Sequence, residues 1–185
     1  MRGSTVIMIE EADSLLVRQC LRGDTRAFGA IVEKYEKTMF NVVIRMVNNY
    51  EDAQDIAQSA FVKAYEKLRT FDSKYKFFSW LYRIVVNESL NFLNQKRNFE
   101  KLDESLISKE KTPEEAYDRV EAGERIRDAL LDLKLEYRTV LVLKHFQNLS
   151  YEEISYIVDV PQKTVKARLF TARQLLREIL LKKGI

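Results

Sequence analysis

Residues that break helices or cross-link chains are scarce in this sequence. Its 185 residues include five glycines, two prolines, one cysteine and one histidine. So little glycine and proline favours long helices over the many tight turns of a sandwich or barrel. Because Cys20 stands alone, an internal disulfide framework and a cysteine-rich zinc site are excluded. His145 lies among apolar and basic residues, where packing or surface exposure is a simpler role than catalysis.

Long apolar runs and alternating strand patterns are missing as well. No stretch is long and apolar enough to span a bilayer, and no secretory signal is visible, so we expect a cytoplasmic protein without direct membrane insertion. The sequence contains no acid–base pair, activated nucleophile, phosphate loop or metal-ligand spacing. We therefore expect an all-α protein that is not an enzyme and that uses no cofactor, metal or small-molecule substrate.

The segment from Leu149 to Phe170 predicts two short helices joined by a tight turn. Ser150 followed three residues later by Glu153 is a capping box, which marks the start of the first helix. Asp159 stands where the turn needs a left-handed residue, and Pro161 suits the start of the second helix. This pattern is typical of a helix-turn-helix motif.

The second helix of this motif has an apolar face and a basic face. Val165, Leu169, Ala172 and Leu176 share one side by their spacing. The other side and its edges carry Lys163, Lys166, Ala167, Arg168, Phe170, Thr171, Arg173 and Gln174. Positive charge and one exposed aromatic fit a recognition helix in a DNA major groove. The alternative is a helical hairpin that packs against a neighbour, with a solvated basic face.

The N-terminal half predicts a bundle of amphipathic helices. A helix from Glu11 to Arg22 precedes a long one that begins near Asp24. The third helix places alanines and Phe61 inward, which suggests close approach to a neighbour. Its outer side includes Asp52, Asp55, Gln58 and Ser59.

The fourth helix follows a turn rich in aromatics and lysines, from Thr70 to Trp80. One of its faces carries Trp80, Ile84, Asn87, Asn91 and Asn94 at helical spacing, and Lys96 and Arg97 close it. Asparagines are poor helix formers, but they can pair with a base edge, and aromatics can stack on unpaired bases. The alternative is a bundle helix with aromatic core residues and a polar exposed face.

A change of composition divides the chain. From Asn98 to Glu121 acidic residues outnumber basic ones and apolar residues are sparse, so we expect a flexible linker over 98–112. The predicted domains are 11–97 and 113–185, and we expect residues 1–10 to be disordered.

Two helical domains on an acidic tether, with a base-reading face in each, resemble a bacterial sigma factor of the extracytoplasmic-function group, which has only sigma regions 2 and 4. The motifs that carry the resemblance are Gly23-Asp24 with Ala27-Phe28, residues 52–65, residues 77–87 and residues 149–173. Departures occur at Asp159 and Lys163, where the family usually has glycine, at Ser59, where a glutamate is common, and at Ala167, where a serine is frequent.

The resemblance implies roles for particular residues and partners. It assigns Asp52, Asp55, Gln58 and Phe61 to the clamp helices of the polymerase β′ subunit. It assigns Phe71, Trp80, Asn87 and Asn91 to opening of the −10 element, and Lys166, Ala167, Phe170 and Thr171 to reading of the −35 element. The implied partners are core RNA polymerase, including its β flap, promoter DNA and an anti-sigma factor. The alternative is a regulator that binds DNA by itself and dimerises through its N-terminal half.

Overall fold

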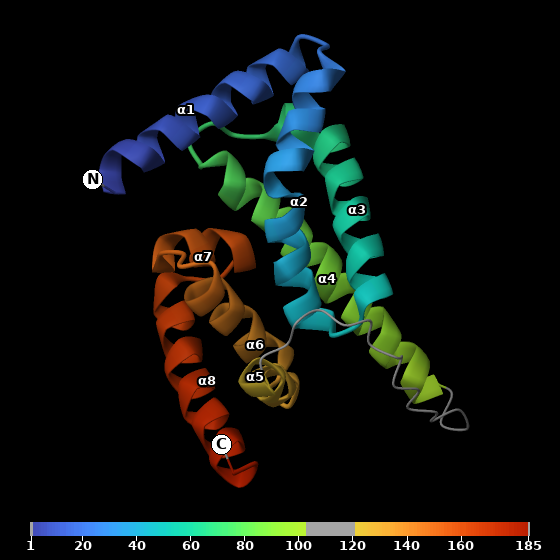
Figure 1. Cartoon of the computed structure of the whole chain (residues 1–185), viewed down its shortest axis with the longest axis vertical. Coiled ribbons are helices and arrows are strands. Elements are labelled where there is room, and N and C mark those ends of the chain that lie inside the picture. Colours follow the sequence, from blue (N-terminus) through green and yellow to red (C-terminus); the bar gives the residue numbers. More distant parts are fainter. Residues whose placement is uncertain (1, 103–120, 185) are drawn as a thin grey trace.

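Every regular element in the described part of the chain is helical (Figure 1). The computed structural model describes residues 2–102 and 121–184. The elements are α1 (Arg2–Leu21), α2 (Thr25–Val47), α3 (Tyr50–Lys67), the 3-10 turn η1 (Leu68–Thr70), α4 (Phe77–Leu102), α5 (Glu121–Leu131), α6 (Leu135–Leu141), the π-helical segment η2 (Val142–Phe146), α7 (Tyr151–Val158) and α8 (Gln162–Lys182). The all-α fold class is confirmed.

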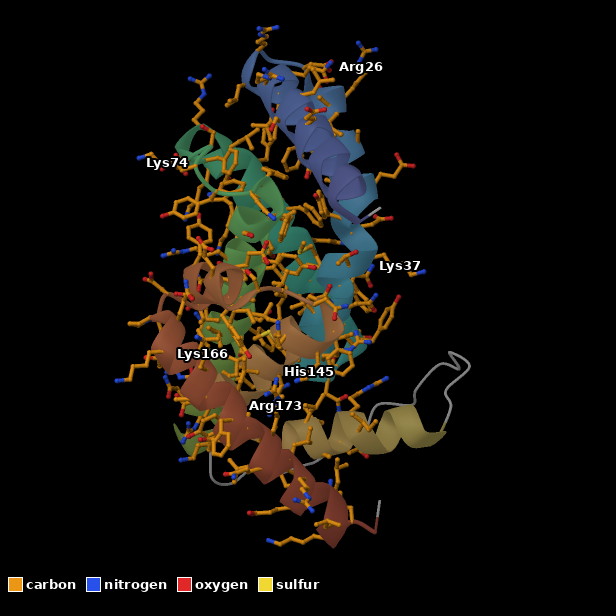
Figure 2. The ribbon with its side chains drawn as sticks, turned by 90° about the vertical axis from the view of Figure 1, so that its left-hand side faces the viewer. Arg26, Lys37, Lys74, His145, Lys166 and Arg173 are labelled. Carbon is orange, nitrogen blue, oxygen red and sulfur yellow. The ribbon has the colours of Figure 1, made fainter. Side chains whose placement is uncertain are left out.

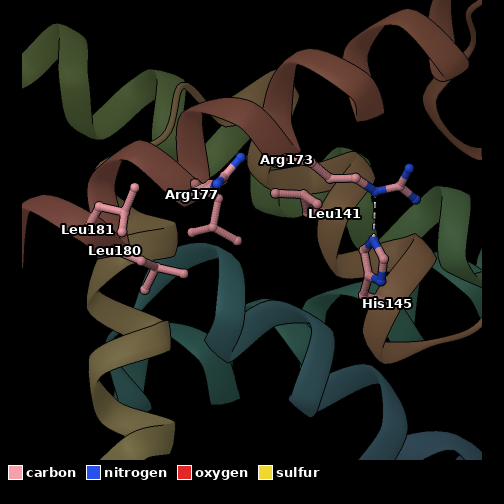
Figure 3. Close-up of a pocket in the computed structure, with 7 residues that line it drawn as sticks. Leu141, His145, Arg173, Arg177, Leu180 and Leu181 are labelled. Atoms are coloured by element: carbon pink, nitrogen blue, oxygen red, sulfur yellow. Dashed lines mark hydrogen bonds between the residues drawn. The ribbon is translucent and has the colours of Figure 1, made fainter. Parts of the chain in front are cut away.

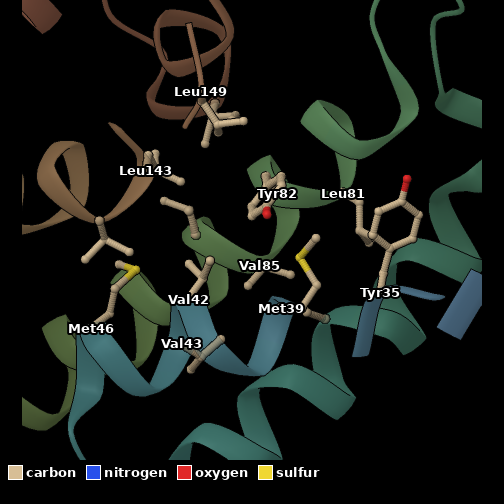
Figure 4. Close-up of a cluster of buried hydrophobic side chains, with 14 of the residues drawn as sticks. Tyr35, Met39, Val42, Val43, Met46, Leu81, Tyr82, Val85, Leu143 and Leu149 are labelled. Carbon is tan, nitrogen blue, oxygen red and sulfur yellow. The ribbon is translucent and has the colours of Figure 1, made fainter. Parts of the chain in front are cut away.

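Helix α2 runs through the middle of the N-terminal half, and local chemistry sets its two ends. The carboxylate of Asp24 caps it by accepting a hydrogen bond from the backbone N–H of Arg26 at 3.0 Å. Asn48 ends it in the left-handed conformation, with φ of 56°, which asparagine tolerates better than most residues. The face buried between these ends, partly drawn in Figure 4, consists of Ala27, Phe28, Ile31, Tyr35, Met39, Val42, Val43 and Met46.

Helices α3 and α4 complete the bundle around α2. Ala53, Ala60 and Ala64 of α3 have no exposed surface, and their small side chains let the helix backbones approach closely. Leu81 and Val85 of α4 are equally buried. The inward and outward faces predicted for α3 are therefore the observed ones.

Helix α1 begins at Arg2, well before the expected start at Glu11, so residues 2–10, which we expected to be disordered, are part of it. No proline lies between Arg2 and Leu21 to stop the helix earlier. The buried carboxylate of Asp13 fixes α1 to α2, because it accepts hydrogen bonds from the Tyr35 hydroxyl and the Lys34 ammonium. Burial and this carboxylate raise the pKa of Tyr35.

The C-terminal half contains the predicted helix-turn-helix. Ser150 Oγ accepts from the Glu153 N–H at 3.1 Å, and the Glu153 carboxylate accepts from the Ser150 N–H at 2.8 Å. Asp159 takes the left-handed conformation, with φ of 55°, and Pro161 precedes the first residue of α8. The capping box and the turn at Asp159 are thus confirmed.

The helix expected from Glu136 to Gln147 differs from prediction, because its second part is the π-helical segment η2. This wider segment is tied to the turn that follows it. The Lys144 ammonium donates to the Leu149 carbonyl oxygen at 2.9 Å, and the Leu149 N–H donates to the Leu143 carbonyl oxygen at 3.2 Å.

The two halves of the chain pack on each other. Val42 and Met46 of α2 belong to the same buried cluster as Leu143 and Leu149 of the C-terminal half (Figure 4). Helix α7 lies against α4. The hydrophobic core is therefore shared between the two sets of helices.

Arg138 joins the halves through backbone carbonyl groups. Its guanidinium donates to the Met46 carbonyl oxygen near the end of α2 at 2.6 Å, and to those of Leu130 at 3.0 Å and Leu131 at 2.6 Å at the end of α5. The guanidinium group has five donors in a planar fork, which suits several carbonyl oxygens at once.

Helix α4 continues to Leu102, beyond Arg97, the residue at which we expected it to end. The rest of the predicted linker, 103–112, lies outside the described residues, so the domain boundaries stay a prediction.

Candidate nucleic-acid interface

Helix α8 presents the predicted outward face. Val165, Leu169 and Ala172 are buried against the rest of the C-terminal half. Lys163, Lys166 and Ala167 are exposed, and 63% of Phe170 is open to solvent. The Phe170 ring therefore lies open on the same side of α8 as Lys163 and Lys166, where it can contact another molecule. The shape and charge of this face suit a DNA groove.

Three cations predicted for this face have partners within the protein, and the first is Lys166, whose Nζ lies 5.5 Å from the centre of the Tyr151 ring. Arg168 forms an ion pair with Glu136 at 3.0 Å. Thr171, the uncharged residue predicted for this face, is half-buried. Arg173 Nε donates to His145 Nε2 at 3.3 Å, and Figure 2 shows the two side chains beside each other. Burial and the charges of Arg173 and Lys144 lower the pKa of His145, which favours the neutral ring that can accept this bond.

The second predicted surface lies on α4 and changes character along the helix. Asn87 and Asn91 are exposed one turn apart. Trp80, two turns before Asn87, is only 7% exposed. Its ring packs against Phe71 and Phe77, with centroids 5.5 Å and 5.6 Å away. The asparagines are thus open to solvent, while the aromatic rings form a closed cluster beneath the turn before α4.

Near its C-terminal end α4 also contacts α3. Lys96 Nζ lies 3.2 Å from the Asp52 carboxylate, so a residue expected to bind DNA pairs with one expected to bind polymerase. Arg97 is exposed. The two surfaces therefore meet along one edge of the bundle.

The outer side of α3 carries three of its four predicted residues. Asp55 and Gln58 are exposed and Asp52 is half-buried, but Phe61 is only 7% exposed and points into the bundle. Two exposed apolar residues were missed: Val62 is 58% exposed and Tyr65 is 48% exposed. Helical spacing was the available signal, since Val62 follows Gln58 by one turn.

A groove between α6–η2 and the C-terminal part of α8 was also missed (Figure 3). It has a volume of about 390 Å³ and is lined by Leu141, His145, Arg173, Leu176, Arg177, Leu180 and Leu181. The sequence feature that could have indicated this groove is the series of leucines that continues the apolar side of α8 beyond Leu176.

In the parts of the chain that the structure describes, we find no helix that could cross a membrane and no cluster of side chains that could hold a metal ion.

Comparison with known proteins shows which family contains chains with these two sets of helices. The sigma-70 region 2 model matches residues 31–99, and the sigma-70 region 4 model matches residues 123–176. The RNA polymerase sigma-H factor of Pseudomonas aeruginosa is 34% identical, with 94% of this chain and 96% of that protein covered. The ECF RNA polymerase sigma factor SigW of Bacillus subtilis is 35% identical, with 88% and 93% covered.

The fold is similar to that of CnrH in its complex with the cytosolic domain of CnrY. The TM-score is 0.71 at 26% identity, over 91% of this chain and 97% of CnrH. Region 2 thus corresponds to the bundle of α2–α4, and region 4 to the helices that carry the helix-turn-helix. With relatives above 30% identity along most of its length, this chain belongs to the sigma-70 family of RNA polymerase sigma factors, within the extracytoplasmic-function group.

Proposed function

We propose that this chain binds core RNA polymerase, directs it to promoters and promotes strand opening, with no bond chemistry of its own. One observation carries the proposal. A single chain with both sigma regions exposes a basic face on α8 and, separately, an asparagine face on α4. A protein that only bound duplex DNA would need the first face but not the second.

The −35 element is read by the exposed face of α8. Lys163 and Lys166 contact phosphates, which position the helix without reading sequence. Phe170 touches a thymine methyl group or a base edge, and Ala167 lets the helix backbone approach the groove. Arg168 and Arg173 support this face from its edges, where their partners Glu136 and His145 hold them.

The −10 element is held by α4. Asn87 and Asn91 address one unpaired base, because they lie one turn apart. Phe71, which belongs to the turn proposed as the rim of this pocket, packs on Trp80 at the start of α4. Lys96 and Arg97 contact phosphates farther along the strand. Each lost base-pair step costs roughly 1–2 kcal/mol, and one captured base can offset about that amount.

The polymerase surface lies on α3. Asp52, Asp55 and Gln58 bind the clamp helices of the β′ subunit, and buried Phe61 supports that helix from beneath. Region 4 meets the β flap. CnrH is complexed with the cytosolic domain of CnrY, which supports a protein partner for this chain too, and the family resemblance implies that this partner is an anti-sigma factor. Since its partner polymerase acts in the cytoplasm, so does this protein.

The test is run-off transcription with purified core polymerase on a promoter library. We expect transcripts from a subset of promoters, and only when this protein is present. A regulator that dimerises and binds DNA alone is the competing function. It would give specific DNA binding without core polymerase and no transcripts, an outcome that would reject the proposal.

A further inference from the structure

One side of α7 lies on the start of α4 and the turn before it. Glu153 Oε1 is 3.2 Å from Lys76 Nζ. Three residues later, the Tyr156 carbonyl oxygen accepts a hydrogen bond from Arg83 at 3.0 Å. After three more, the Asp159 carboxylate lies 3.3 Å from the same guanidinium. The Glu153 carboxylate of α7 and the Asp159 carboxylate of the turn after it are thereby placed on two cations of region 2.

An aromatic stack lies between these two ion pairs. The ring of Tyr156 stacks on that of Tyr75, with centroids 4.0 Å apart and planes 20° from parallel. Arg83 covers the Tyr156 ring at 5.1 Å. The ring of Tyr156 thus contacts both a tyrosine and an arginine of the N-terminal half, the kinds of side chain on which an unpaired base stacks.

The receiving surface has the chemistry of a single-stranded nucleic-acid site. Such sites combine cations along the backbone with aromatic side chains that stack on bases. Tyr75 and Lys76 belong to the turn that rims the proposed base pocket, and Arg83 is one turn before Asn87 on α4. What α7 presents has the complementary chemistry: two carboxylates in place of phosphates and one flat ring in place of a base.

We propose that Glu153, Tyr156 and Asp159, the α7 latch, act as an internal mimic of single-stranded DNA that covers this surface in the free protein. The inference rests on the proposed function, since Tyr75, Lys76 and Arg83 adjoin the residues proposed to hold the −10 element. Opening of the latch must precede capture of an opened strand. Closure covers Tyr75, Lys76 and Arg83, the approach to the −10 residues, while Asn87, Asn91 and the outward face of α8 stay exposed.

The ion pairs of the latch are weak enough for it to open. The Asp159 side chain is 80% exposed and that of Lys76 is 41% exposed, and ion pairs this close to solvent contribute little stability. The apparent dissociation constant of a ligand for the covered surface equals the intrinsic one divided by the fraction of molecules that are open. A partner that draws α7 away from α4 would therefore strengthen binding at the covered surface.

The first experiment measures binding of a fluorescein-labelled, random-sequence, single-stranded 15-nucleotide DNA by anisotropy. We expect Tyr156→Ala and Asp159→Asn each to bind it about three- to tenfold more tightly than the parent chain. Asp159→Asn keeps a residue that tolerates the left-handed turn. The matched controls are Tyr156→Phe, which keeps the stacking ring, and Glu178→Gln, which removes one exposed charge from α8, away from the latch. Both should bind within twofold of the parent. Equal affinity in all variants, with unchanged thermal melts, would overturn the latch.

The second experiment follows the distance between the halves. Dyes are placed at Lys37→Cys and Gln174→Cys, both exposed positions, in a Cys20→Ser background. Energy transfer should fall when the single strand is added, and should already be low in Tyr156→Ala. Binding of the strand without any fall in transfer would show that α7 does not cover its site. If run-off transcription succeeds and the latch tests fail, this inference alone is rejected; if transcription fails, the proposed function is rejected.

Discussion

At the scale of residues, Lys166 and Phe170 share one side of α8 but are expected to act differently. Lys166→Ala should weaken binding to every −35 sequence and lower the slope of log affinity against log salt by about one unit, because one phosphate contact is lost. Phe170→Ala should instead relax sequence preference. Binding of the holoenzyme to −35 variants at several salt concentrations measures both effects.

The control for this pair is Gln174→Ala, one turn farther along the exposed side of α8. We expect it to change neither the salt slope nor the preference. If Phe170→Ala keeps the parent's sequence preference while its thermal melt is normal, this side of α8 is not the reading face.

Asn87 provides a second prediction at this scale. Its side chain is exposed, so Asn87→Ala should leave polymerase binding and folding intact. We expect promoter opening to slow by about tenfold, since a base contact is worth roughly 1–3 kcal/mol. Permanganate reactivity of the −10 thymines reports the opened strand, and Asn94→Ala, two turns away on α4, is the matched control. Parent-like reactivity in Asn87→Ala would remove this residue from the pocket.

At the scale of elements, Glu153 connects the pH of the solution to the stability of α7. Burial raises its pKa, but hydrogen bonds from Ser150 and Lys76 and the charge of Lys76 outweigh burial, so the pKa lies below its ordinary value. A depressed carboxyl pKa stabilises the folded state above the unfolded value, and this stabilisation is lost as the pH falls through the folded value.

We therefore expect acid to destabilise the parent chain more than Glu153→Gln, which keeps an acceptor for the Ser150 N–H. Urea unfolding at pH 7, 4 and 3 measures the effect. The difference between the two proteins should shrink as the pH falls, by less than about 1 kcal/mol because the pair with Lys76 is partly exposed. A difference that is the same at all three pH values would mean that the carboxylate charge is not what stabilises α7.

For the individual elements, local sequence patterns predicted the buried faces and the turn correctly, but they did not predict contacts between residues that are far apart in the sequence. Periodicity identified the buried side of α2, and the capping box and Asp159 located the turn, because neighbouring residues determine these features. Sequence alone did not show that Trp80 lies in a closed aromatic cluster. Nor did it show that Lys76 and Arg83 bind α7, because a cation on a solvated surface and one in a contact between distant helices have the same local pattern.

At the scale of the whole molecule, the shared core is the main addition to the sequence-based interpretation. An acidic tether suggested two independent domains, yet Met46 and Leu143 belong to one buried cluster, and Arg138 donates to the Met46 carbonyl oxygen. Apolar residues such as Leu143 could equally have completed a core within the C-terminal half. Hydrophobic periodicity gives the face that is buried but not the partner that covers it.

This arrangement leads to a prediction about the cut chain. The composition of 98–112 predicts that limited digestion with a glutamate-specific protease cleaves there first, at Glu104 or Glu110, and leaves two helical fragments. Because the halves share a buried cluster and the Arg138 bonds, we expect the fragments to elute together from a sizing column at low salt. High salt should separate them more readily, since it screens the ion pairs that Lys76 and Arg83 form with α7.

Arg138→Met provides the sharper version of this experiment. It keeps the apolar stem but leaves the Met46 carbonyl oxygen without its donor, and loss of a hydrogen bond to a charged group costs roughly 1.5–3 kcal/mol. The nicked variant should release its fragments under conditions in which the nicked parent stays whole. Because Arg138 also binds Leu130 and Leu131 at the end of α5, circular dichroism of the isolated C-terminal fragment must show that its helices persist. First cuts inside either half would contradict the domain layout, and immediate separation of the parent fragments would contradict the shared core.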